Sequence, residues 1–310
     1  MFFFNLNSIE FLVINQQISF QFPNEITLHI KREDMIHPFV SGNKFRKLKY
    51  NLLKAKEEKK TKLLTFGGAF SNHIAAVAYA GKDNNFETIG IIRGDELESH
   101  ITENPTLLFA QECGMKFQFV SREEYKNKTT NLFIENLKNR YGDFYLIPEG
   151  GANSLAVKGC EEIITEEDSR FSHICCSIGT GGTISGLINA SHLHQKIIGF
   201  SSLKGEFLSD DIRKFAVKNN WELVTDYHFG GYGKINEELV SFINDFYKQT
   251  TIPLDPIYTG KMLFGIIDLI EKGYFPKGAN ILAIHTGGLQ GIKGMNAYLK
   301  KKNLQQIITQ

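Results

Sequence analysis

The stretch HICCSIGTGGTISG, residues 173–186, decides the class of fold. An apolar run ends at Ile178, glycines and threonines follow, and apolar residues then recur at helical spacing. This order predicts a buried strand, a tight turn and a helix. Glycines let several backbone N–H groups point to one place, and a helix N-terminus adds positive potential, so the turn predicts a phosphate cradle. A tight turn without a ligand is the alternative. The cradle residues are Gly179, Thr180, Gly181, Gly182 and Thr183.

Two nucleotide-binding motifs do not match this stretch. A Walker loop would end in GK[ST], which is missing, and the glycines at 179, 181 and 182 do not give the dinucleotide pattern G-x-G-x-x-G. A nicotinamide-dependent oxidoreductase is therefore disfavoured. The turn predicts a phosphate group that carries few other substituents.

Strand-like runs alternate with helical patterns on both sides of this stretch, which is typical of parallel βαβ units. The sequence therefore predicts the α/β class. Three more glycine-rich turns, at 66–73, 147–154 and 284–291, also follow strands. Ligands of parallel sheets bind beyond the carboxyl ends of strands, so we expect all four turns to meet at one crevice. The runs are 26–32, 62–66, 88–93, 116–120, 144–148, 173–178, 196–201 and 281–286.

Composition limits the function further. The chain has 310 residues, is 42% hydrophobic, and carries 35 basic and 34 acidic residues for a net charge of +1, so it lacks the basic excess of a nucleic-acid-binding protein. We expect a small-molecule ligand. The first 13 residues lack the basic start of a signal peptide, and no apolar stretch is long enough to span a membrane.

The cysteines indicate a reducing compartment. Their spacing is not that of a metal site, and the adjacent pair lies in an apolar run, where buried free thiols are common. The four are Cys113, Cys160, Cys175 and Cys176. We therefore expect a cytoplasmic protein without a metal.

Lys44, in SGNKFRKL at 41–48, stands where a helix is expected to begin near Asn43. A lysine there opposes the helix dipole, which suggests a use for a neutral amine, although a solvated helix face is the alternative. Ser71 and Asn72 open another helix after a strand, either as a cap or as donors to a carboxylate. His73 beside them is expected to be a packed or exposed bystander.

Two tyrosines lie in loops of the C-terminal third. Tyr258 and Thr259 precede a helix in DPIYTGKMLFG, and Tyr232 is at the centre of the glycine loop FGGYGKINEE. Each stretch could be an ordinary turn. A functional role for both loops is favoured because the chain also has the other glycine-rich turns.

The ordered set of motifs resembles a family of pyridoxal-phosphate (PLP) enzymes that includes D-cysteine desulfhydrase and 1-aminocyclopropane-1-carboxylate (ACC) deaminase. The resemblance extends from Lys31 to Gly288. It implies two α/β domains of the tryptophan-synthase-β type with the cofactor between them, a large domain at 1–57 and 156–310, and a small domain at 58–155 inserted in it. It also implies a homodimer. The motifs are KRED, SGNKFRKL, GGAFSNH, PEGGANS, SIGTGGTISG, GGYGKIN, DPIYTGK and IHTGG.

The resemblance also implies roles for single residues. Lys44 would form the Schiff base with pyridoxal 5'-phosphate and then act as the base, and Asn72 would bond the phenolic oxygen of the cofactor. Ser71 would bind the substrate carboxylate or assist proton movement. Thr259 would face the pyridine nitrogen, and the phosphate would lie in the 179–183 cradle. Tyr258 and Tyr232 would reach the substrate, whereas the contact of Thr286 stays open.

The choice of reaction depends on Thr259, where ACC deaminases have a glutamate. A carboxylate keeps the pyridine nitrogen protonated, and a threonine does not, so the ring is a weaker electron sink. That favours β-elimination of a sulfur leaving group, giving pyruvate, ammonia and sulfide from a small amino acid. The alternatives are ACC deaminase and a non-catalytic PLP-binding protein. The stretch SNHIAA lacks the arginine usual after the serine–asparagine pair, and Ala69-Phe70 replaces the common Ile-Gln, which leaves the substrate open.

Overall fold

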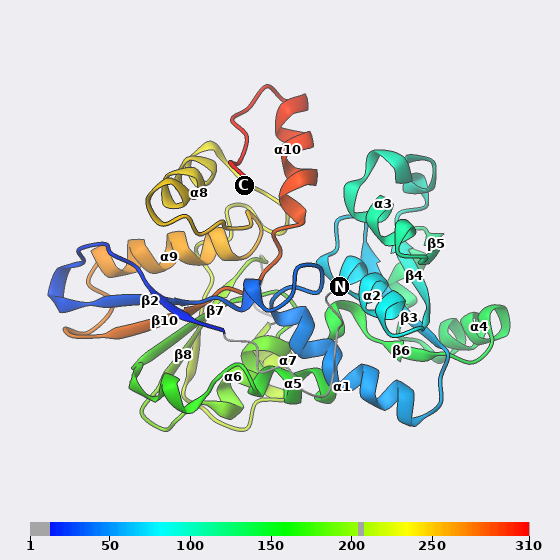
Figure 1. The fold of residues 1–310 in the computed structure, drawn as a ribbon, viewed down its shortest axis with the longest axis horizontal. Coiled ribbons are helices and arrows are strands. Elements are labelled where there is room, and N and C mark those ends of the chain that lie inside the picture. Colours follow the sequence, from blue (N-terminus) through cyan, green and yellow to red (C-terminus); the bar gives the residue numbers. More distant parts are fainter. Residues whose placement is uncertain (1–12, 204–207, 310) are drawn as a thin grey trace.

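A computed structural model describes residues 13–203 and 208–309 of the chain. The N-terminal stretch on which the expectation of no signal peptide rests lies mostly within residues 1–12, outside the described part. Two separate sheets, each with its own helices, lie side by side, and α1 (Asn43–Glu57) runs between them (Figure 1). The predicted α/β class is confirmed.

The larger sheet has six strands in the order β1-β2-β10-β7-β8-β9. Every neighbouring pair is parallel except β1 and β2, which are antiparallel. Helices cover both faces, as in Figure 1, where α8 and α9 lie above the sheet and α5 and α6 below it. The strands are β1 (Asn15–Gln17), β2 (Thr27–Lys31), β7 (His173–Ile178), β8 (Lys196–Ser201), β9 (Trp221–Val224) and β10 (Asn280–Ile284). The other helices are α5 (Ser154–Glu161), α6 (Gly182–Ala190), α7 (Leu208–Arg213), α8 (Glu237–Thr250), α9 (Thr259–Glu271) and α10 (Gly291–Lys301).

Alternating side chains of the central strands fill two cores. In β10, Ile281 and Ala283 pack in the core with α8 and α9, whereas Leu282 and Ile284 pack in the core with α6 on the opposite face. Successive side chains of a strand point to opposite faces, so a strand between two helical layers must be apolar throughout. This is why the central strands read as continuous apolar runs.

The smaller sheet has four parallel strands in the order β5-β4-β3-β6. It is built from residues 62–147, and the larger sheet takes strands from both sides of that segment. The domain bounds at 58–155 remain a prediction. The strands are β3 (Lys62–Gly68), β4 (Glu87–Arg93), β5 (Lys116–Val120) and β6 (Tyr145–Ile147), and the accompanying helices are α2 (Asn72–Asp83), α3 (Pro105–Glu112) and α4 (Asn131–Tyr141).

All eight strand-like runs form strands in the structure, with ends shifted by at most two residues. The sequence reading missed β1 and β9, because NQQ is short and polar and a charged Glu222 interrupts WELV. Within the described residues, no helix combines the length and the apolar character needed to cross a bilayer.

Candidate active site

A cavity of about 700 Å³ lies where the two sheets face each other. Residues that follow strands of both sheets line it, together with the first turn of α1. All four glycine-rich turns contribute to this lining, so the predicted convergence at one crevice is confirmed.

Lys44 lies in the first turn of α1 and lines the cavity. The preceding Gly42 has φ +59°, and a Cβ there would lie 2.1 Å from the carbonyl oxygen of Thr286, so the chain can enter the helix only through a glycine. The Lys44 amine donates to Asn43 Oδ1 at 3.0 Å, and Asn43 Nδ2 donates to Thr183 Oγ1 at 3.0 Å. Burial, with a smaller contribution from the Lys47 ammonium, lowers the pKa of Lys44 to about 7.

Lys47, one turn further along α1, is a cavity residue that the sequence reading missed. It is only 3% exposed, and its amine donates to the carbonyl oxygen of Gly150 at 3.2 Å. A Cβ on Gly182 would lie 3.5 Å from this amine, at the start of α6. No ion pair to a carboxylate joins Lys47 within the described residues, and burial lowers the pKa of Lys47, so an anion in the cavity would be the partner that favours its charged form. The spacing of three residues from Lys44 was the available signal.

The glycine loop after β7 has the shape of an anion cradle. Gly181 takes a left-handed conformation with φ +79° and caps α6, so the helix N-terminus opens toward the cavity. Gly179, Thr180, Gly181 and Thr183 line the cavity, and Gly182 lies behind them against Lys47. Backbone N–H groups, threonine hydroxyls and a buried ammonium together suit a phosphate group.

Ser71 and Asn72 line the opposite wall, at the end of β3. Ser71 Oγ caps α2 by accepting from the N–H groups of His73 at 3.2 Å and Ile74 at 3.3 Å, so its role as a helix cap is real. Asn72 Oδ1 accepts from Gln290 Nε2 at 2.9 Å, which orients the asparagine amide. Gln290 was missed by the sequence reading, because 218 residues separate the two side chains.

His73 is a neutral histidine in the cavity wall, 2% exposed. The Thr65 hydroxyl donates to the carbonyl oxygen of Ile147, so it accepts from His73 Nε2, 2.8 Å away. The other ring nitrogen, Nδ1, is buried and makes no hydrogen bond within normal distance in the described part of the chain. Burial first, then the charges of Lys44 and Lys47, hold the pKa of His73 well below its usual value.

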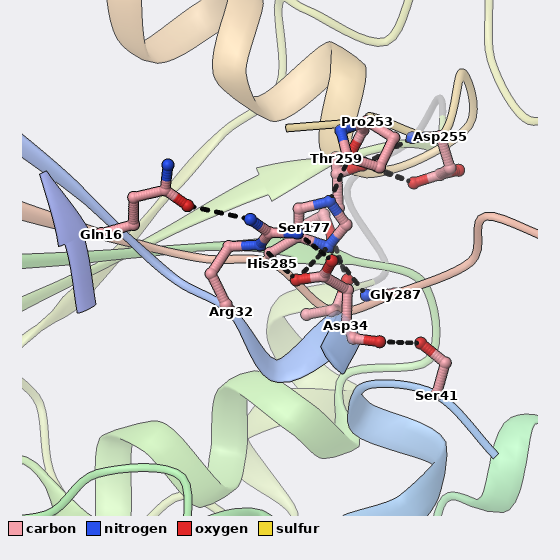
Figure 2. A network of polar contacts seen from close by, with 11 residues as sticks. Gln16, Arg32, Asp34, Ser41, Ser177, Pro253, Asp255, Thr259, His285 and Gly287 are labelled. Atoms are coloured by element: carbon pink, nitrogen blue, oxygen red, sulfur yellow. Dashed lines mark hydrogen bonds and ion pairs between the residues drawn. The ribbon is translucent and has the colours of Figure 1, made fainter. Parts of the chain in front are cut away.

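The tyrosines and Thr259 differ in their access to the cavity. Tyr232 and Tyr258 both line it, with ring centroids 6.2 Å apart. Thr259 is 0% exposed: its hydroxyl donates to Asp255 Oδ1 at 2.8 Å and accepts from the backbone N–H of Asp255 at 2.9 Å (Figure 2). The Thr259 hydroxyl is thus engaged in fixing the loop before α9 and does not line the cavity, and its place at the pyridine nitrogen stays a prediction.

Thr286 and Ser177 supply the hydroxyls that do line the cavity in this region, with their oxygens 3.1 Å apart. A buried network holds the turn that carries Thr286 (Figure 2). His285 Nε2 donates to the carbonyl oxygen of Pro253 at 2.7 Å, and its Nδ1 accepts from the N–H of Gly287 at 3.2 Å. Thr286 is therefore held rigidly at the end of β10.

Comparisons with known proteins agree with this geometry. The family model described as pyridoxal-phosphate dependent enzyme matches residues 19–287. A bifunctional D-cysteine desulfhydrase/ACC deaminase of Arabidopsis thaliana is 32% identical over 87% of this chain and 74% of that protein. An ACC deaminase of Bradyrhizobium diazoefficiens is 27% identical over 90% of this chain and 92% of that protein.

A solved structure shows the same architecture. The crystal structure of an ACC deaminase homologue superposes with a TM-score of 0.78 at 29% identity and covers 93% of both chains. The cofactor of this group of enzymes is pyridoxal 5'-phosphate. The family match and the relatives together show that this chain belongs to the pyridoxal-phosphate dependent enzymes.

Proposed function

We propose that this enzyme deaminates a small amino acid by β-elimination in the manner of a D-cysteine desulfhydrase, releasing pyruvate, ammonia and sulfide. The observation that carries the proposal is the Lys44 amine, whose pKa of about 7 leaves it half neutral near pH 7, beside a phosphate cradle. A neutral amine is the form that a nucleophile and a base require.

The residues around the cavity fit pyridoxal 5'-phosphate. Gly179–Thr183 and the Lys47 ammonium suit its phosphate, and the Asn72 amide suits its phenolic oxygen. When bound, the cofactor supplies an aldehyde that reacts with amines and a ring that withdraws electrons from the substrate α-carbon. Ser71 and the N–H groups at the start of α2 suit the substrate carboxylate.

Lys44 is the proposed base. Its Nζ removes the proton from the substrate α-carbon, and the side chain then holds that proton inside the cavity. Asn43 accepts from the same amine at 3.0 Å and so keeps it in place between these steps. Tyr232 and Tyr258 line the cavity, and the proposal gives their hydroxyls the role of donors to the departing β-substituent.

For the ring nitrogen we propose Thr286 in place of Thr259, because Thr286 lines the cavity. Both residues are threonines, so with either one the pyridine nitrogen lacks a carboxylate partner and the cofactor ring is a weak electron sink. The carboxylates in the lining already have cationic partners: Arg32 bonds Asp34 at 2.8 Å, and Lys128 lies 3.3 Å from Glu149. A neutral partner at the ring nitrogen favours a substrate with its own leaving group over a cyclopropane ring.

The test compares two substrates. We expect kcat/KM for D-cysteine, measured as pyruvate and sulfide, to exceed kcat/KM for ACC, measured as 2-oxobutanoate, by about tenfold or more, a barrier difference of ~1.4 kcal/mol. Lys44→Ala is the control and should abolish both reactions. Efficient ACC turnover without pyruvate from D-cysteine would favour the alternative, an ACC deaminase. A protein that binds the cofactor and turns over neither substrate would support the non-catalytic reading.

The same proposal includes the organisation implied by the resemblance. We propose a cytoplasmic homodimer, with a large domain at 1–57 and 156–310 and a small inserted domain at 58–155. Light scattering after size-exclusion chromatography should give twice the chain mass of 35.1 kDa. A mass of one chain at micromolar concentration would contradict the dimer.

A further inference from the structure

The loop between β9 and α8, residues 225–236, carries Tyr232 to the cavity without a helix or strand of its own. Four of its residues have positive φ: Phe229 at +52°, Gly230 at +91°, Gly231 at +112° and Gly233 at +70°. Such a backbone has little intrinsic preference for one shape. Backbone bonds inside the loop, from the Gly231 N–H to the His228 carbonyl at 3.0 Å and from the Lys234 N–H to the Gly231 carbonyl at 3.1 Å, hold two turns of it. Further fixation of Tyr232 comes from outside the loop.

Lys261 of α9 contacts the loop, as does Asp268 of the same helix, which accepts from the Tyr227 hydroxyl at 2.5 Å. The Lys261 side chain is only 1% exposed, and its amine donates to the carbonyl oxygens of His228 at 2.8 Å and Gly231 at 2.9 Å. No salt bridge to a carboxylate involves Lys261 within residues 13–203 and 208–309. Burial lowers the pKa of Lys261 to about 8, so the amine still carries its charge at neutral pH. The two carbonyls belong to the first and last residues of the turn from His228 to Gly231, which directly precedes Tyr232.

We propose that Lys261 is a positioning residue for Tyr232, acting through the carbonyl oxygens of His228 and Gly231. Lys261 lies three residues after Tyr258, the N-cap of α9, so the contact to the Tyr232 loop and the second tyrosine are at the same end of α9. The Tyr232 and Tyr258 rings meet edge to face with centroids 6.2 Å apart. The role of the pair in turnover rests on the proposed function, whereas the anchoring of the loop can be measured without it.

The first experiment measures the loop itself in the cofactor-loaded protein. Tyr232 is 49% exposed and Lys234 is exposed, so chymotrypsin and trypsin can report on opening of the loop. Lys261→Met removes the donor and should raise cleavage at these two sites by about tenfold, because cleavage follows the population of the open form. Lys248→Met on α8 is the control, because this exposed lysine pairs with Asp245 at 2.9 Å away from the loop, and it should not change cleavage. Equal cleavage in wild type and Lys261→Met would overturn the inference.

The second experiment separates positioning from general destabilisation. Lys261→Met should raise KM for D-cysteine about tenfold with a smaller change in kcat and an unaltered cofactor absorption spectrum. Lys261→Arg keeps a charged donor and should restore loop protection and KM at least in part. In a double-mutant cycle, the effects of Lys261→Met and Tyr232→Phe should be strongly non-additive, since the proposed effect of Lys261 is exerted through the position of Tyr232. Additive effects would contradict the inference.

Two further outcomes keep the proposals distinct. If the wild type turns over neither D-cysteine nor ACC while Lys261→Met still exposes the loop, the proposed function fails and the anchoring stands. If Lys261→Met does not fold, hydrogen exchange of peptides from 225–236 in Lys261→Arg and wild type decides the matter. Fast exchange of that segment in the wild-type protein would overturn the inference.

Discussion

At the scale of single residues, the proposed chemistry depends on the protonation of Lys44. Because its pKa is lowered to about 7, the amine is charged below that pH and neutral above it. We predict that the rate at which apoenzyme bonds covalently to pyridoxal phosphate rises through pH 7 and then levels off. Visible absorbance followed after mixing measures this rate. Borohydride reduction and peptide mass spectrometry should find the pyridoxyl group on Lys44, and a label on another lysine would contradict the assignment.

The second residue-scale prediction concerns the phosphate. Lys47→Met removes a buried ammonium beside Gly182 while keeping the length of the side chain. A charge-assisted hydrogen bond is worth about 1.5–3 kcal/mol, so the Kd for pyridoxal phosphate should rise by roughly 10- to 100-fold. Equilibrium titration of apoenzyme measures it. Lys49→Met, which disrupts a partly exposed pair with Glu162 on the same helix, should leave the Kd unchanged.

The third concerns the two threonines. Thr259→Val leaves the buried Asp255 without a hydroxyl donor and the Asp255 N–H without an acceptor, so we expect a loss of about 1–3 kcal/mol in the free energy of unfolding. Thr286→Val should cost less stability and should change the cofactor absorption spectrum, because Thr286 lines the cavity. Urea unfolding and absorbance spectra measure the two effects. The opposite pattern would restore Thr259 to the ring nitrogen.

At the scale of elements, glycines let three helices approach closely beneath the cradle. A Cβ on Gly159 of α5 would lie 1.9 Å from the carbonyl oxygen of Arg46 in α1, and a Cβ on Gly186 of α6 would lie 2.5 Å from the Cβ of Cys160. Added volume at these contacts must move backbone and not a flexible side chain. The close packing therefore fixes the distance between Lys44 and the loop that begins α6.

We predict that Gly159→Ala lowers the free energy of unfolding by about 1–3 kcal/mol or more, as over-packing does, and also weakens cofactor binding. The second effect follows because displacing α1 from α5 moves Lys44 and Lys47 relative to the cradle. Urea midpoints and cofactor titration provide the two measurements. Lys158→Ala, an exposed substitution on the same helix, is the control. Stability loss with unchanged cofactor affinity would show that α1 adjusts without moving its lysines.

At the scale of the whole molecule, the proposed cofactor site takes residues from the parts of the chain that form both sheets. Lys44 and the cradle belong to the larger sheet's part of the chain, and Ser71 and Asn72 follow β3 of the smaller sheet. A ligand at about 100 times its Kd stabilises the folded protein by ~2.7 kcal/mol. We predict that pyridoxal phosphate raises the Tm by several degrees in calorimetry. Pyridoxal without phosphate should give a smaller shift, and equal shifts would argue against the cradle.

The sequence alone predicts the main strands, the glycine-rich turns at their ends and the special position of Lys44. Continuous apolar runs such as 173–178 must be strands between two helical layers, because no other short element buries both faces. Glycine-rich turns after four strands place a ligand at the carboxyl ends of the sheets. Lys44 stands out because a lysine at a helix start is unfavourable unless its neutral amine has a use. These signals are local, so they can be read without knowing which segments meet.

Only the tertiary structure decides which side chains face the cavity. The motifs assign Thr259 to the pyridine nitrogen and leave the contact of Thr286 open, yet in the structure Asp255 bonds the Thr259 hydroxyl and Thr286 lines the cavity. The use of Lys47 depends on Gly150 and Gly182, more than 100 residues away, and that of Lys261 depends on a loop 30 residues earlier. The sequence points to the helix dipole at the position of Lys44, whereas in the structure burial of the amine is the largest cause of its lowered pKa. Contacts between distant segments set direction and burial, and a linear pattern does not contain them.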